Sequence, residues 1–181
     1  MKKLLLSIAT MFMLVTPTLA DNFYSSSSGQ WAVFGHTGSE DLNPACVMRT
    51  SWNDGSRMYI IQDLADGELY IYFENMKWNI TGPYNKEHEM EIKFFSGQSV
   101  KALKASFNLT TNNNIHIRGI KHDMFLDPFV IADRMEFIMP GNIPDATIGL
   151  IGTRDAVEYL KGCVRMSNNV KLIYPNKRSS I

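Results

Sequence analysis

The sequence predicts a mainly β fold: an antiparallel β-sandwich or partly closed barrel with two short helices and one disulfide. Three observations predict it. Apolar and polar residues alternate with a period of two in many short segments, turn residues separate these segments, and no strand–helix–strand alternation occurs. Two segments carry helix end signals, and the sequence contains two cysteines.

The alternation is clearest between residues 69 and 94. Apolar residues occupy every second position in three sets, with turn residues between them: Leu69, Ile71 and Phe73; Trp78 and Ile80; Met90, Ile92 and Phe94. A period of two places each set on one face of a pleated strand. We therefore expect a β-meander here, at the centre of the sheet.

Residues 1–20 have the features of a secretory signal peptide. Lys2 and Lys3 precede a short apolar run, and Thr18, Leu19 and Ala20 end in a small-residue cleavage pattern. The run is short for a membrane-spanning helix. Cleavage would leave 16 basic and 18 acidic residues without a long run of either sign, so no nucleic-acid partner is expected. We expect a bacterial protein that is periplasmic or secreted, with no transmembrane anchor after signal cleavage.

The mature chain divides into three parts. Residues 21–29 contain a serine run and are expected to form a flexible leader, and residues 176–181 a flexible tail. Residues 30–175 form a single β-rich domain. Besides the meander we expect strands at residues 31–34, 46–50, 57–63, 100–110, 115–117, 135–139 and 148–150, with a polar loop at residues 35–44.

Two helices are expected near the C-terminus. Asp127 followed by Pro128 is typical of an N-cap and first helical position, which predicts a short helix ending at about Arg134. Thr153 is expected to cap a second helix that ends at about Leu160.

Cys46 and Cys163 both follow the signal peptide. In an oxidising compartment an even pair of cysteines is most simply a disulfide. A catalytic thiol or a metal ligand is the alternative, but the sequence has no CxxC pattern and no histidine beside either cysteine. We expect a structural disulfide between them.

Four residues are candidates for a binding site. Tyr70 and Tyr72 lie on the polar face of their strand, where tyrosines can form a recognition surface for protein or glycan. The alternative is that a second layer covers this face. His122 lies beside Asp123, and a neighbouring carboxylate can orient an imidazole or join it at a metal. Without a GxSxG, GxGxxG, P-loop or EF-hand pattern, the sequence assigns no catalytic residue, cofactor or metal site.

Two fragments are similar to a known family. Trp31, Ala32 and Val33 leading to Cys46, Val47 and Met48, and the segment of residues 148–156, resemble the opening and closing patterns of invasion-associated locus B proteins. The resemblance implies a small exported bacterial β protein, of a kind linked to host-cell invasion, and transfers no catalytic residue. This sequence lacks the additional cysteines of that family and has a longer middle.

These observations lead to three hypotheses. The first is a non-enzymatic exported protein that binds a protein or another cell-envelope component near Tyr70 and Tyr72. The second is an envelope inhibitor or immunity protein that blocks a hydrolase with the loop at residues 35–44. The third is an envelope hydrolase that uses His122 and Asp123.

Overall fold

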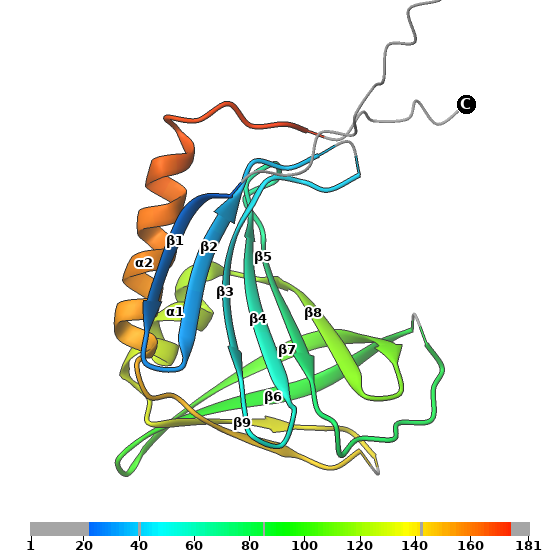
Figure 1. Ribbon diagram of the computed structural model, residues 1–181. Helices are drawn as coiled ribbons and strands as arrows, with labels where there is room; N and C mark the ends of the chain where they lie inside the picture. Colours follow the sequence, from blue (N-terminus) through cyan, green and yellow to red (C-terminus); the bar gives the residue numbers. More distant parts are fainter. Residues whose placement is uncertain (1–21, 40, 85, 142, 175–181) are drawn as a thin grey trace, which may run out of the picture.

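The computed structural model describes residues 22–39, 41–84, 86–141 and 143–174. Within these ranges ten strands form one antiparallel sheet and two helices pack against it (Figure 1). The elements, in chain order, are β1 (Asn22–Ser28), β2 (Trp31–His36), β3 (Ala45–Ser51), β4 (Arg57–Asp63), β5 (Leu69–Glu74), β6 (Glu87–Ser96), β7 (Ser99–Thr111), β8 (Asn114–Ile120), α1 (His122–Ile131), β9 (Arg134–Ile138), β10 (Ala146–Gly149) and α2 (Thr153–Ser167). The predicted signal peptide and C-terminal tail lie outside the described residues.

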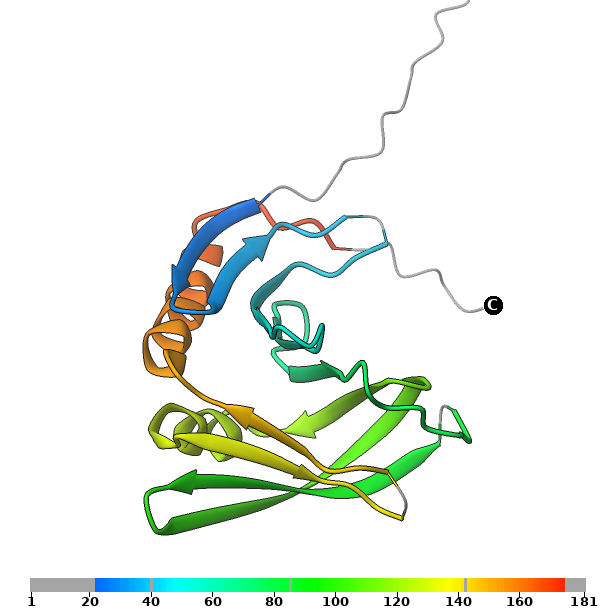
Figure 2. The same ribbon diagram turned by 60° about the horizontal axis from the view of Figure 1, so that its bottom comes forward.

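The strands lie in the order β1-β2-β3-β4-β5-β8-β7-β6-β9-β10. The first five follow chain order, then β8, β7 and β6 follow in reverse chain order, and β9 and β10 complete the sheet. The sheet curls, so that β1 and β2 face β6 and β9 across the interior, with both helices at the open side (Figure 2). The predicted mainly β antiparallel fold is confirmed, as one curved and unclosed sheet.

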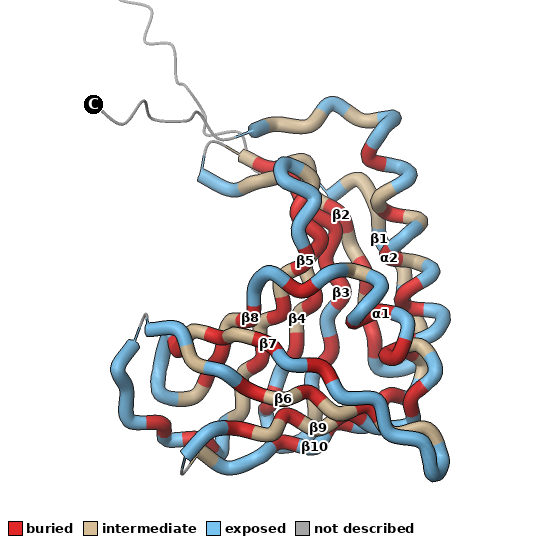
Figure 3. Tube along the Cα trace, turned by 180° about the vertical axis from the view of Figure 1, so that it is seen from behind, coloured by how far each residue is buried: buried red, intermediate tan, exposed pale blue. Residues whose placement is uncertain are grey.

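The core lies inside this curl (Figure 3). Alternate residues of each strand point inward and are buried, as the period of two requires. Phe73 of β5 meets Phe137 of β9 across the interior, with ring centroids 5.1 Å apart. Trp31 of β2 packs edge-on against Phe129 of α1 at 5.5 Å, so the helices close the core that the sheet leaves open.

The predicted disulfide joins Cys46 of β3 to Cys163 of α2 and is confirmed. Both cysteines are fully buried, and α2 packs against β1, β2 and β3. Gly35 of β2 lies beneath the bond. A Cβ atom at Gly35 would lie 2.5 Å from Cys163 Sγ and 2.6 Å from the Phe23 ring, so only glycine permits this close approach.

The prediction of a flexible leader is wrong for the described residues 22–28, which form β1. The strand pairs with β2 from Asn22 opposite His36 to Ser28 opposite Trp31. Ladder hydrogen bonds use backbone groups, so the serine run can form them without apolar side chains. Phe23 and Tyr24 supply the burial that the serines lack, because both pack against the core.

The predicted meander at residues 69–94 is also wrong. β5 pairs with β4 and β8, whereas β6 pairs with β7 and β9. Trp78 and Ile80 lie between them outside any strand, 4% and 5% exposed. Their buried side chains anchor an irregular connection over one end of the core. There the Ile80 N–H donates to the Asn112 carbonyl at 2.6 Å.

The helices differ from their predicted bounds. α1 begins at His122, and Pro128 lies inside it, so Asp127 is not its N-cap. Burial of Phe125, Leu126 and Phe129 against the core outweighs the hydrogen bond that the proline removes. α2 begins near the predicted point but continues to Ser167, and Thr153 lies inside it with a buried hydroxyl that donates to Leu150 and Phe129 carbonyls.

Candidate binding surface

A row of aromatic and charged residues crosses the outward face of the sheet. The strand registers place Arg49 of β3 opposite Tyr59 of β4, Tyr59 opposite Tyr72 of β5, and Tyr72 opposite His116 of β8. The residues directly before and after each of these four are buried, so the four side chains themselves point away from the core. Tyr70 lies two positions before Tyr72 on the same face of β5. We call Tyr59, Tyr70, Tyr72 and His116 the tyrosine row.

The rings of the tyrosine row contact one another at steep angles. Tyr59 and Tyr72 have centroids 5.9 Å apart with planes at 69°, and Tyr72 and His116 are 6.5 Å apart at 62°. Tyr70 lies 5.7 Å from His116 at 49°. All four side chains are half-buried. The row therefore presents ring edges and partly exposed faces rather than one flat platform.

The polar groups of the row have defined partners. The Tyr70 hydroxyl donates to Asp66 Oδ2 at 2.7 Å, and this hydrogen bond, with burial, raises the pKa of Tyr70 far above its usual value. Burial, with the charge of Glu74, raises the pKa of Tyr72. Both phenols therefore stay neutral at physiological pH.

His116 is also kept neutral. Burial lowers its pKa below the usual value, and the charge of Arg118 lowers it further. The Arg118 guanidinium lies 3.3 and 3.4 Å from His116 Nδ1 through two of its nitrogens. A guanidinium only donates, so Nδ1 accepts and the imidazole proton resides on Nε2.

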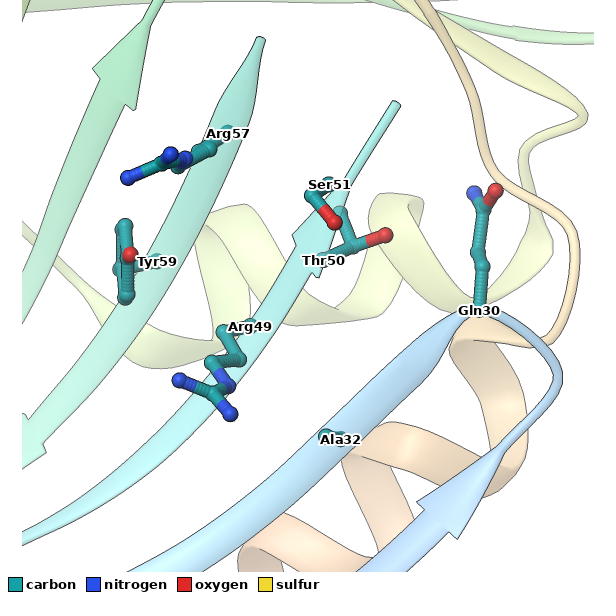
Figure 4. A pocket seen from close by; sticks show the side chains of 7 residues that line it. All are labelled: Gln30, Ala32, Arg49, Thr50, Ser51, Arg57 and Tyr59. Carbon is teal, nitrogen blue, oxygen red and sulfur yellow. The ribbon is translucent and has the colours of Figure 1, made fainter. Parts of the chain in front are cut away.

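Two arginines flank one end of the row. Arg49 and Arg57 are exposed and line a depression of about 410 Å³ together with Tyr59 and four other residues: Gln30, Ala32, Thr50 and Ser51 (Figure 4). The Arg49 guanidinium lies 5.3 Å from the centre of the Phe34 ring. This depression gives the aromatic row a positively charged end.

The two predicted pairs lie apart. Tyr70 and Tyr72 belong to the row, and no described contact joins them to His122 or Asp123 at the start of α1. Asp123 Oδ1 accepts from the Met124 N–H at 3.0 Å, a bond that serves the helix backbone. No described hydrogen bond joins it to His122, whose Nε2 is buried without a partner. The hydrolase hypothesis stays a prediction, and replacing His122 by Ala is its direct test.

The sequence did not single out Tyr59, Arg49 or Arg57 as site residues. Alternation in residues 57–63 could have assigned Arg57 and Tyr59 to one face. Their proximity to Tyr72 depends on which strands pair and in what register, and no local pattern carries that information.

The loop after β2 differs from its prediction. Gly35 and His36 belong to β2, and the described loop residues are tied down at several points. Ser39 N–H donates to the Leu42 carbonyl at 2.8 Å, and Asn43 Nδ2 donates to Asp63 Oδ2 at 2.8 Å. Leu42 is 51% exposed at this turn.

The described part of the chain contains no cluster of three or more His, Cys, Asp or Glu side chains placed to hold a metal ion. It also contains no helix that is long and apolar enough to cross a membrane.

No known protein family matches the sequence, and no curated protein matches it. Among solved structures, the fold is similar to the crystal structure of invasion associated protein B from Bartonella henselae, with a TM-score of 0.50 and 13% sequence identity. The likeness covers 78% of this chain and 99% of that chain. At this identity the likeness concerns the fold.

Proposed function

We propose that this chain is an exported, non-enzymatic β protein that binds another protein through the tyrosine row. The observation that carries the proposal is the register that aligns Arg49, Tyr59, Tyr72 and His116 across four strands on an outward face. The described helices pack on the opposite face, where Cys163 of α2 reaches Cys46. A partner can therefore approach the row directly.

The composition and geometry of the row favour a protein partner. Tyrosine and arginine dominate the binding energy of many protein–protein interfaces, because each offers a large contact area with hydrogen-bonding groups. Ring planes at 62° and 69° do not form the flat stacking surface that a sugar ring would use. Neighbouring rings also limit each other's motion, which reduces the entropy lost on binding.

Export is supported by three independent features. Residues 1–20 have signal-peptide character. The buried disulfide is of a kind that persists in oxidising compartments such as the periplasm. The fold is similar to that of a Bartonella protein whose name associates it with invasion. We therefore propose a periplasmic or secreted location and a relationship to the invasion-associated locus B proteins.

In the binding test, three immobilised forms of the mature protein are each incubated with an extract of cell-envelope proteins, and the retained proteins are compared. They are the wild type, the Tyr72→Ser variant, and the matched control Tyr174→Ser, which alters an exposed tyrosine outside the row. A specific partner should be retained by the wild type and Tyr174→Ser but lost from Tyr72→Ser. The purified partner should then bind Tyr72→Ser at least about tenfold more weakly. Equal retention by all three forms would refute this function.

A second candidate is an envelope inhibitor that uses the predicted loop at residues 35–44, through the turn that Ser39 and Leu42 close. The observation that favours it is the exposed Leu42 on a turn held by the Ser39–Leu42 and Asn43–Asp63 hydrogen bonds. An inhibitor presents such a preorganised side chain to its target. If the protein inhibits an envelope hydrolase, Leu42→Asp should abolish the inhibition and Tyr72→Ser should preserve it.

A further inference from the structure

The depression at the charged end of the tyrosine row results from the way β2 and β3 pair. The ladder between them begins at Ala32 opposite Arg49, so Thr50 and Ser51 of β3 lie beyond its first pair. Gln30, in the turn before β2, lies on the far side of the resulting gap (Figure 4). Arg49, Thr50, Ser51 and Gln30 thereby surround a space of about 410 Å³ that no ladder partner fills.

The two guanidinium groups lie on either side of the Tyr59 ring. Arg49 is directly opposite Tyr59 across the ladder, and Arg57 lies two positions before Tyr59 on the same face of β4. Figure 4 shows the three side chains projecting together from β3 and β4. Two positively charged side chains and one phenol therefore line the same depression.

Neither arginine takes part in an ion pair with another described residue. Among the described residues, the ion pairs join Lys77 to Asp54, Lys93 to Glu91, Arg134 to Glu136 and Lys161 to Glu158. Glu74 is opposite Arg57 on β5, so a carboxylate lies near that arginine, whereas Arg49 is opposite Ala32 and Tyr59. A guanidinium without an ion-pair partner attracts an anionic ligand.

We infer that this depression binds the carboxylates of an acidic segment of the partner protein. The inference rests on the proposed function, because the depression is the charged end of the tyrosine row. A guanidinium presents two parallel N–H donors that match a carboxylate, and the Gln30 amide supplies further donors. Tyr59 provides apolar contact for the carbon atoms of an Asp or Glu side chain.

The test measures binding of a short fluorescent peptide rich in Glu and Tyr, beside a counterpart in which Gln replaces each Glu. The variants are Arg49→Gln and Arg57→Gln. Arg154→Gln, at an exposed arginine of α2, is the charge-matched control. Loss of a charge-assisted hydrogen bond should weaken binding of the Glu peptide by about tenfold or more in each depression variant. Arg154→Gln should bind like the wild type, and the Gln peptide should bind at least as weakly as the depression variants bind the Glu peptide.

Four results would overturn the inference. They are equal binding of the Glu and Gln peptides, an equal loss in Arg154→Gln, arginine-dependent binding of polygalacturonate without binding of the Glu peptide, and binding of a phosphoserine peptide without the Glu peptide. Arg49→Lys keeps the charge but loses the paired donors, and it should weaken binding less than Arg49→Gln. Peptide binding is compared only among variants whose melting temperatures match that of the wild type.

Retention of envelope proteins separates this inference from the proposed function. If Tyr72→Ser loses a partner that Arg49→Gln and Arg57→Gln both retain, the acidic-segment inference is wrong and the protein-binding function stands. If none of these variants changes retention, both are wrong.

Discussion

At Gly35 the strand passes beneath the disulfide with no room for a side chain. A Cβ there would lie 2.5 Å from Cys163 Sγ and 2.6 Å from the Phe23 ring, so Gly35→Ala must move α2 or β1. We expect a loss of about 1–3 kcal/mol in the free energy of unfolding, as measured by urea denaturation. Gly149→Ala is the control, because a Cβ at Gly149 meets no atom within 4 Å. Equal stability of both variants would contradict the packing at Gly35.

His116 links stability to pH. Because burial and Arg118 lower its pKa in the folded protein, the unfolded chain binds a proton more readily. Stability is therefore greatest above the usual histidine pKa of about 6.5 and falls as the pH drops from there through the lower folded value. His36, whose pKa burial also lowers against the opposing charge of Asp63, acts in the same direction.

The pH prediction is checked by the melting temperature between about pH 7.5 and about pH 5. The wild type should lose melting temperature over this window, and His116→Gln should lose less. An identical decrease in the two proteins would show that burial of His116 does not contribute to the pH dependence of stability.

β1 shows how an edge strand can form from a polar segment. Its backbone groups complete the β2 ladder, while Phe23 and Tyr24 pack against the core and α2 contacts the strand. A chain that begins at Gly29 would lose these contacts and expose the β2 edge. We expect it to unfold at lower urea concentration than a chain that begins at Asp21, with a loss of at least about 2 kcal/mol.

Size-exclusion chromatography gives a second measure for the same pair of chains. The shorter chain should associate, because an unprotected strand edge pairs with other chains. Equal stability and equal elution of the two chains would mean that β1 contributes nothing to the fold.

The disulfide acts on most of the molecule at once. It joins residues separated by 117 positions, so it restricts the unfolded chain from β3 to α2. The Cys46→Ala and Cys163→Ala double variant should lose about 2–5 kcal/mol in the free energy of unfolding. A reducing agent should destabilise the wild type by a similar amount and leave the double variant unchanged. A reductant effect on the double variant would point to a cause other than this bond.

Local patterns were sufficient for several parts of the fold. Alternation identified most strands, and the face to which Tyr70 and Tyr72 belong, because the pleat has a period of two whatever the strand's neighbours are. Two cysteines in a chain with a signal-like N-terminus predicted the bond that the structure contains. Local patterns failed where tertiary contacts outweighed them: at β1, at the Trp78 connection, and at Pro128 inside α1.

The sequence by itself thus determined the secondary-structure class, the outward direction of Tyr70 and Tyr72, and the disulfide, because each depends on residue type and spacing along the chain. Only the tertiary structure decided that β8 lies beside β5, and therefore that His116 meets Tyr72. The register of β3 on β4 likewise decided that Arg49 lies opposite Tyr59. Strand order and register come from burying the whole core at once, through contacts between residues far apart in the chain. The tyrosine row is a product of that pairing.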